Sequence, residues 1–107
     1  MVLLMYTVTK NFPSDEVFGL CSQMRRCAVS ITSNIAEGFS RQSRKEKIQF
    51  FTIALGSITE LQNQLFVARD VGYMKDDMFR RCADTSIRVQ KLIHGLLKYL
   101  RSQPINT

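Results

Sequence analysis

The stretch that decides the fold is Ser43–Gly72, SRKEKIQFFTIALGSITELQNQLFVARDVG. Its apolar residues recur three and four positions apart, which is the spacing of one face of an α-helix. One apolar stripe comprises Phe51, Ala54, Ile58, Leu61, Leu65 and Ala68, and further apolar residues lie on other faces, namely Phe50, Ile53, Leu55, Phe66 and Val67. A helix that is apolar on more than one side needs more than one packing neighbour. The stretch therefore predicts a long helix packed against several others.

Both ends of this helix carry the expected local signals. Ser43 followed three residues later by Glu46 forms a capping-box pattern, in which the serine hydroxyl accepts from a free backbone N–H of the first turn. Gly72 is the usual kind of residue just past a helix end. The sequence therefore predicts a helix from Ser43 to about Gly72.

Three further helical segments flank this one. Residues 1–10 are apolar but short, and Pro13 with Ser14, Asp15 and Glu16 predicts the start of a helix that ends near Gly38. Its predicted inward residues are Val17, Leu20, Cys21, Met24, Cys27, Ala28, Ile31 and Ile35. The last helix, about residues 75–101, is predicted to place Met78, Cys82, Val89, Leu92, Ile93, Leu96 and Leu100 inward and to form the exposed pairs Asp77–Arg81 and Asp84–Arg88.

The predicted fold class is all-α, an up-and-down antiparallel four-helix bundle with a shortened first helix. A chain of 107 residues rarely supports two cores, so residues 1–107 are predicted to form a single domain. Short connections make consecutive helices antiparallel. Because the first helix is far shorter than its neighbours, part of the groove that it covers is left open, is filled by another subunit, or takes a segment upstream of Met1.

The charge and the cysteine content indicate the class of partner and the compartment of the protein. Fifteen Lys and Arg against nine Asp and Glu give a net charge of +6, which favours phosphate-bearing or otherwise acidic partners. Cys21, Cys27 and Cys82 form no CxxC pair, which favours a reducing compartment, the cytoplasm. The apolar start ends at Lys10, too short for a membrane span, so neither membrane insertion nor secretion is predicted.

The basic excess falls into two patches. Residues 40–47 hold four cations against Glu46, a sum of +3, and residues 75–107 hold seven against three aspartates, a sum of +4. The candidate nucleic-acid-binding residues are Arg41, Arg44, Lys45 and Lys47 in the first patch and Arg81, Arg88, Lys91 and Lys98 in the second. Ser40 and Ser43 join the first patch, where a helix N-terminus favours an anion. A solvated loop and a soluble outer helix face are the alternative interpretations. With no interleaved aromatic residues, binding would depend on backbone charge rather than sequence.

A polar group on the second predicted helix is interpreted as a structural network. Its candidate members are Arg25, Arg26, Asn34 and Glu37, with Glu60 facing them from the next helix. The group lacks a nucleophile beside a base, so no catalytic residue and no enzymatic activity are predicted. We expect loss of Glu60 to destabilise the protein or its assembly.

No cofactor, metal or small-molecule substrate is predicted. His94 is the one histidine, and the Glu-x-x-His pairs of di-iron bundles are absent. No Gly-rich nucleotide-binding motif occurs, and the methionines are interpreted as core residues.

Several motifs resemble one known family. They are FPSDE at residues 12–16, FGL at 18–20, QMRR at 23–26, AVSI at 28–31, SNIAEG at 33–38 and GSITELQ at 56–62. Together they resemble the four-helix-bundle proteins of the 23S ribosomal RNA intervening-sequence family. The resemblance implies a four-helix bundle that assembles as a ring-like homopentamer, encoded within insertions of bacterial large-subunit ribosomal RNA genes. It implies no known biochemical activity.

The resemblance also bears on partners. A related branch resembles the accessory proteins of diversity-generating retroelements, basic pentamers that bind nucleic acid and a reverse transcriptase. Family members usually carry further residues ahead of the position of Met1, which implies either a late start or a trimmed first helix here. The expected function is a non-enzymatic homo-oligomer whose basic surface binds RNA or DNA backbone without sequence preference. The alternative is a protein-interaction scaffold, or an accessory subunit, whose basic surface docks an acidic protein.

Overall fold

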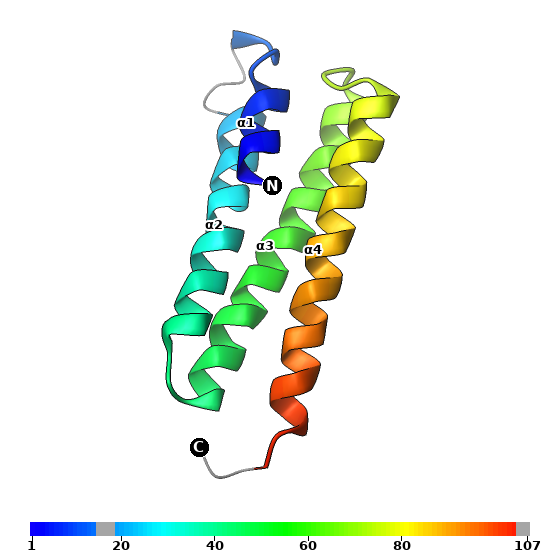
Figure 1. The fold of residues 1–107 in the computed structure, drawn as a ribbon. Helices are drawn as coiled ribbons and strands as arrows, with labels where there is room; N and C mark the ends of the chain where they lie inside the picture. The colour runs from blue at the N-terminus through cyan, green and yellow to red at the C-terminus, as the bar shows by residue number, and fades with distance from the viewer. Residues whose placement is uncertain (15–18, 105–107) are drawn as a thin grey trace.

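The protein is described by a computed structural model that covers residues 1–14 and 19–104. Four helices follow one another along the chain: α1 (Val2–Thr9), α2 (Leu20–Ser40), α3 (Arg44–Asp70) and α4 (Asp76–Ser102). They form an elongated antiparallel bundle of 51 × 23 × 18 Å (Figure 1). The predicted all-α fold with a short first helix is confirmed.

α3 is the central element, as its several apolar faces require. It packs against α2 on one side and against α4 on the other. α1 packs against α2 and also contacts α4, beside only the upper part of the bundle (Figure 1). Among the described residues, no Cα atom of α2 lies within 8 Å of one in α4, so these two helices depend on α1 and α3 to bridge them.

The ends of α3 follow from local hydrogen bonding. The Ser43 hydroxyl accepts from the Glu46 N–H at 3.1 Å, which satisfies a first-turn donor. At the other end Gly72 has φ +86°, a conformation that favours glycine. There the N–H of Tyr73 donates to the Ala68 carbonyl at 2.8 Å and that of Gly72 to the Arg69 carbonyl at 3.0 Å, the Schellman arrangement. Both predicted ends of this helix are confirmed.

The structure describes the second helix only from Leu20 onward. α2 as described begins at Leu20, with Gly19 in the N-cap position. Of the predicted start at residues 14–16, Asp15 and Glu16 lie outside the described residues. The predicted core residue Val17 also lies outside them.

The core lies where α1, α2, α3 and α4 face one another. The predicted α3 stripe is confirmed, since each of its six members is at most 1% exposed. Side chains buried on the other helices include Met5 and Val8 of α1, Met24, Cys27 and Ile31 of α2, and Cys82, Ile93 and Leu97 of α4. At the top of the bundle Phe12 is buried against Tyr73, with ring centroids 5.4 Å apart.

One predicted core position on α4 is wrong. Leu92 is 68% exposed, whereas Leu97, which was not predicted, is 2% exposed. The periodicity of α4 allows either side of its apolar stripe to face inward. Leu92 lines the groove between α2 and α4, where it stays exposed, whereas Leu97 lies in the core. Neither predicted pair on the outer face, Asp77–Arg81 or Asp84–Arg88, forms an ion pair within 4 Å, although all four residues are described.

Candidate nucleic-acid interface

The cations of the α2–α3 connection are mostly engaged within the protein. The Arg41 guanidinium pairs with the carboxylates of Glu37 at 3.1 Å and Glu46 at 3.5 Å, and it lies 4.8 Å from the ring centroid of Phe50. The Ser43 hydroxyl, another predicted anion ligand, is the N-cap of α3. These groups therefore organise the connection between the two helices.

Arg44 and Lys47 have structural partners too. Arg44 Nη1 donates to the Gln103 carbonyl at 2.8 Å, which ties the start of α3 to the end of α4. Lys47 Nζ donates to the carbonyls of Gly38 and Phe39, both at 3.2 Å, and so satisfies free acceptors in the last turn of α2. Among the described residues of this patch, Lys45 is the one cation with neither a hydrogen bond nor an ion pair. Phosphate binding here stays a prediction, with few cations free to support it.

The cations of α4 are arranged differently. Arg81, Arg88, Lys91 and Lys98 are all exposed, and none makes a hydrogen bond or ion pair with another described residue. At 1.5 Å per residue the stripe is about 26 Å long. The sequence from residue 85 to residue 104 contains no Asp or Glu. The structure therefore leaves the second predicted patch available to a partner.

The residues of the predicted polar group lie on two different sides of α2. Arg26 Nη2 pairs with Glu60 Oε1 at 3.0 Å and also donates to Gln23 Oε1 at 2.6 Å, with both charged side chains about half exposed. Nearby, the hydroxyls of Ser30 and Ser57 lie 2.9 Å apart. These contacts join α2 to α3 along one edge.

The other predicted members lie elsewhere or make local contacts. Asn34 Nδ2 donates to the Ser30 carbonyl at 2.8 Å, and Glu37 pairs with Arg41. Arg25 faces α1, where its Nε donates to Thr9 Oγ1 at 2.8 Å and its guanidinium lies 4.5 Å from the centre of the Tyr6 ring. Arg25 and Arg26 are adjacent in sequence but hold different helices, because successive residues point about 100° apart around a helix.

The thiols of Cys27 and Cys82 are poor nucleophiles. Burial is the main cause that raises the pKa of Cys27, and the charge of nearby Glu60 raises it further. Burial likewise raises the pKa of Cys82, to about 11. Gln64, next to Cys27 in the α2–α3 interface, keeps a buried Oε1 without a hydrogen-bond partner. Both thiols are therefore protonated at neutral pH.

Within residues 1–14 and 19–104, no group of three His, Cys, Asp or Glu could hold a metal ion.

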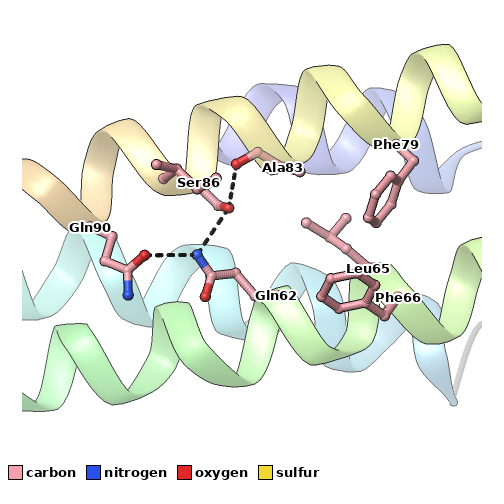
Figure 2. A pocket seen from close by; sticks show the side chains of 8 residues that line it. Gln62, Leu65, Phe66, Phe79, Ala83, Ser86 and Gln90 are labelled. Carbon is pink, nitrogen blue, oxygen red and sulfur yellow. Dashed lines mark hydrogen bonds between the residues drawn. The ribbon is translucent and has the colours of Figure 1, made fainter.

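A mostly apolar pocket between α3 and α4, with two glutamines at one end, was not foreseen from the sequence. Gln62 Nε2 donates to Ser86 Oγ at 3.2 Å and to Gln90 Oε1 at 3.1 Å (Figure 2). The pocket has a volume of about 250 Å³, and its other end is closed by Phe66 and Phe79, whose ring centroids lie 5.3 Å apart. Because the two rings come from different helices, no aromatic motif marks the site in the sequence.

A larger groove separates the lower parts of α2 and α4. It has a volume of about 510 Å³ and an almost wholly apolar lining, which includes Ile35, Phe39, Val89, Leu92, Leu96 and Tyr99. Three of these side chains are far more exposed than is usual for their size: Leu92 at 68%, Tyr99 at 62% and Phe39 at 59%.

No helix among the described residues has the length and apolar character needed to cross a membrane.

Comparison with known proteins bears on the family. A crystal structure from Bacteroides thetaiotaomicron, of a protein with unknown function from the S23 ribosomal protein family, is 25% identical to this chain. It superposes with a TM-score of 0.80 and covers 91% of this chain and 88% of its own. No curated protein matches the chain. The family described as 23S rRNA-intervening sequence protein matches residues 1–95. With the fold and this match over most of its length, the chain belongs to the 23S rRNA-intervening sequence protein family.

Proposed function

We propose that the protein is a non-enzymatic, homo-oligomeric nucleic-acid-binding protein and that α4 supplies its backbone-binding face. One observation carries this proposal: the four exposed cations Arg81, Arg88, Lys91 and Lys98 lie along one helix and are unpaired, whereas those of residues 41–47 are mostly engaged. Unpaired cations gain most from phosphate contacts, because binding releases the counterions of the nucleic acid without breaking an internal ion pair.

The predicted behaviour is weak, salt-dependent binding without sequence preference. Four phosphate contacts with a single strand would give a slope of about −3 in a plot of log affinity against log salt. Fluorescence anisotropy with a labelled RNA hairpin and a labelled single strand of unrelated sequence measures this slope. Similar affinities for both probes are expected. Absence of binding at low salt would overturn the proposal.

A charge-matched pair of variants tests the location. Arg88→Gln/Lys91→Gln/Lys98→Gln removes three cations from α4, and Lys10→Gln/Lys45→Gln/Lys75→Gln removes three exposed cations from elsewhere. The first variant is expected to lose most of the salt dependence, and the second little of it, although both have the same net charge. Equal losses would show that net charge, and not α4, determines binding.

Homo-oligomerisation is supported by a face of α3 that exposes apolar side chains. Ile53 and Val67 are 47% and 42% exposed there, and no helix among the described residues covers them. Burial of such side chains between subunits would add apolar area that a small core lacks. Light scattering should give a multiple of the 12.3 kDa chain mass, a pentamer by family resemblance, and Ile53→Glu/Val67→Glu should lower it. A monomer for the unmodified chain would contradict this part.

A protein-interaction scaffold is the second candidate function. It is favoured by the groove between α2 and α4, which exposes Phe39, Leu92 and Tyr99 together. Large exposed apolar patches of this kind mark interaction sites in soluble proteins.

A further inference from the structure

The pocket between α3 and α4 is a small site with a neutral lining. None of the residues that line it is charged. Its volume of about 250 Å³ lies just below the range of roughly 300–1,000 Å³ that is usual for small-molecule sites. Burial of an unpaired charge among such residues would be costly, because nothing there replaces its hydration. The pocket therefore suits one neutral, planar ring system.

The glutamine end of the pocket offers one acceptor and one donor. Gln62 Nε2 donates to Ser86 Oγ at 3.2 Å and to Gln90 Oε1 at 3.1 Å (Figure 2). Within the part of the chain that the structure describes, Gln62 Oε1 and Gln90 Nε2 have no hydrogen-bond partner. An unpaired nucleobase has the matching groups, because each base carries a donor next to an acceptor on its Watson–Crick edge, which proteins read by hydrogen bonding.

The aromatic end of the pocket suits the face of such a base. Phe66 is 50% exposed, and its ring centroid lies 5.3 Å from that of Phe79. The Arg69 guanidinium holds both rings, at 5.2 Å from the Phe66 centroid and 4.5 Å from the Phe79 centroid. Stacking on an aromatic side chain accepts any base, because every base has a π-face. The pocket therefore combines stacking with hydrogen bonding to the base edge, the two contacts by which proteins bind unpaired bases.

Cations of the proposed nucleic-acid-binding face lie next to this pocket. Arg88 and Lys91 directly follow the lining residues Ile87 and Gln90 along α4. Neither cation makes a hydrogen bond or ion pair with another described residue. The cations attract phosphates, whereas the neutral pocket accepts an uncharged ring. A strand whose phosphates follow α4 therefore passes beside the pocket.

We propose that the α3–α4 pocket binds one unpaired nucleobase of a strand whose phosphates lie along the cations of α4. The base stacks at the Phe66–Phe79 end, and its edge bonds with Gln62 Oε1 and Gln90 Nε2. This inference rests on the proposed function and deepens it, because it adds a contact that only an unpaired base makes. It adds little sequence preference, since all four bases offer a donor beside an acceptor.

Charge-matched probes test the ligand. One is a short labelled single strand, and the other has the same phosphates but abasic sites in place of its bases. Anisotropy titration of the full chain at low salt should show at least about fivefold weaker binding of the abasic strand, because stacking is lost. Equal affinity would overturn this inference and leave the proposed function standing. Absence of binding to either strand would overturn both.

A free nucleoside monophosphate distinguishes a base within a strand from a free nucleotide. It should compete only weakly with the labelled strand, because it lacks the neighbouring phosphates that contact α4. Competition as effective as that of the unlabelled strand would overturn the inference, since the pocket would then be a nucleotide site that does not need the strand.

Matched variants locate the base. Phe66→Ala removes the exposed ring of the pocket, and Tyr99→Ala removes an exposed ring of α4 outside it. Phe66→Ala should bind the single strand at least about fivefold more weakly and a blunt duplex as before, whereas Tyr99→Ala should bind both as before. Ala83→Leu fills the pocket without removing a ring and should act like Phe66→Ala.

Folding and assembly are checked on the same variants. Circular dichroism melting confirms that each variant folds. Equal losses in Phe66→Ala and Tyr99→Ala, or unchanged strand binding by Ala83→Leu, would overturn the inference. A lower oligomeric mass of Phe66→Ala in light scattering would also overturn it, because the pocket would then be part of a subunit interface.

Discussion

Gly38 lies directly against the ring of Phe51, so closely that a Cβ at Gly38 would come within 2.8 Å of Phe51 Cδ1 and 2.9 Å of Phe51 Cζ, and nearer still to Cε1. Phe51 is 1% exposed and has no room to move away. This contact sets the approach of the end of α2 to the start of α3.

The first prediction follows from this contact. Gly38→Ala should destabilise the protein by about 1–3 kcal/mol, because the methyl group overpacks the α2–α3 interface. Gly56→Ala is the control, since Gly56 also lies within a helix but has no atom within 4 Å of the added Cβ. That change should stabilise the protein by about 0.5–1 kcal/mol through helix propensity. Urea denaturation measures both, and a stabilising Gly38→Ala would refute the overpacking argument.

The second prediction concerns the ion pair between Arg26 and Glu60. Because these side chains are 58% and 48% exposed, Glu60→Ala should lower the free energy of unfolding by less than about 1 kcal/mol. A double-mutant cycle with Arg26→Ala isolates the pair, and the coupling is expected at about 0.2–1 kcal/mol. A loss above about 2 kcal/mol would mean that Glu60 is buried in an assembly of the chain.

The third prediction tests the cap of α3. Ser43→Ala removes the acceptor of the Glu46 N–H and should cost about 1 kcal/mol. Ser40→Ala is a suitable comparison, because the Ser40 hydroxyl only donates to the Glu37 carbonyl within the last turns of α2. Its effect should stay below about 0.5 kcal/mol. Equal effects in chemical denaturation would show that the Ser43 cap is not a specific source of stability.

The fourth prediction concerns pH. The unfolded chain releases the Cys82 proton near the ordinary pKa of 9.0, whereas the folded protein retains it until the pKa of about 11. The folded state therefore binds more protons between these values, and stability should fall as pH rises from 9 to 11. The Cys82 contribution is at most about 2–3 kcal/mol.

Comparison with Cys82→Ala isolates this effect. The variant lacks the titrating thiol and is otherwise identical in sequence. Its stability should therefore fall less steeply between pH 9 and 11 in urea denaturation, although at neutral pH the smaller side chain costs about 1 kcal/mol. Parallel pH profiles would contradict a raised Cys82 pKa.

The predicted ends of α3 and the predicted inward face of α4 show which structural features the sequence can and cannot predict. Ser43 and Gly72 mark the ends of α3 correctly because their hydrogen bonds join residues at most five apart. The error at Leu92 has another origin. Leu92, Ile93, Leu96 and Leu97 form a continuous apolar band, and its inward half depends on which neighbouring helices cover it.

The candidate site shows the same limit. Arg44 and Lys47 appear in the sequence as free cations of a basic loop, but each donates to a backbone carbonyl at a neighbouring helix end. Arg81 and Arg88 appear to have aspartates four residues away, yet neither forms the ion pair within 4 Å. Side-chain pairing on a surface depends on rotamers and on distant backbone atoms, which periodicity does not encode.

The amino-acid sequence by itself determined the four helices, their order and the apolar stripe of α3, because the i to i+4 hydrogen bonds, the caps and the 3.6-residue period are local properties of the chain. Only the tertiary structure decided which cations remain free, that Arg25 and Arg26 hold different helices, and that Phe39, Leu92 and Tyr99 share one open groove. Those features depend on which distant segments pack together: α2 and α4 each contact α1 and α3, but among the described residues they do not contact each other.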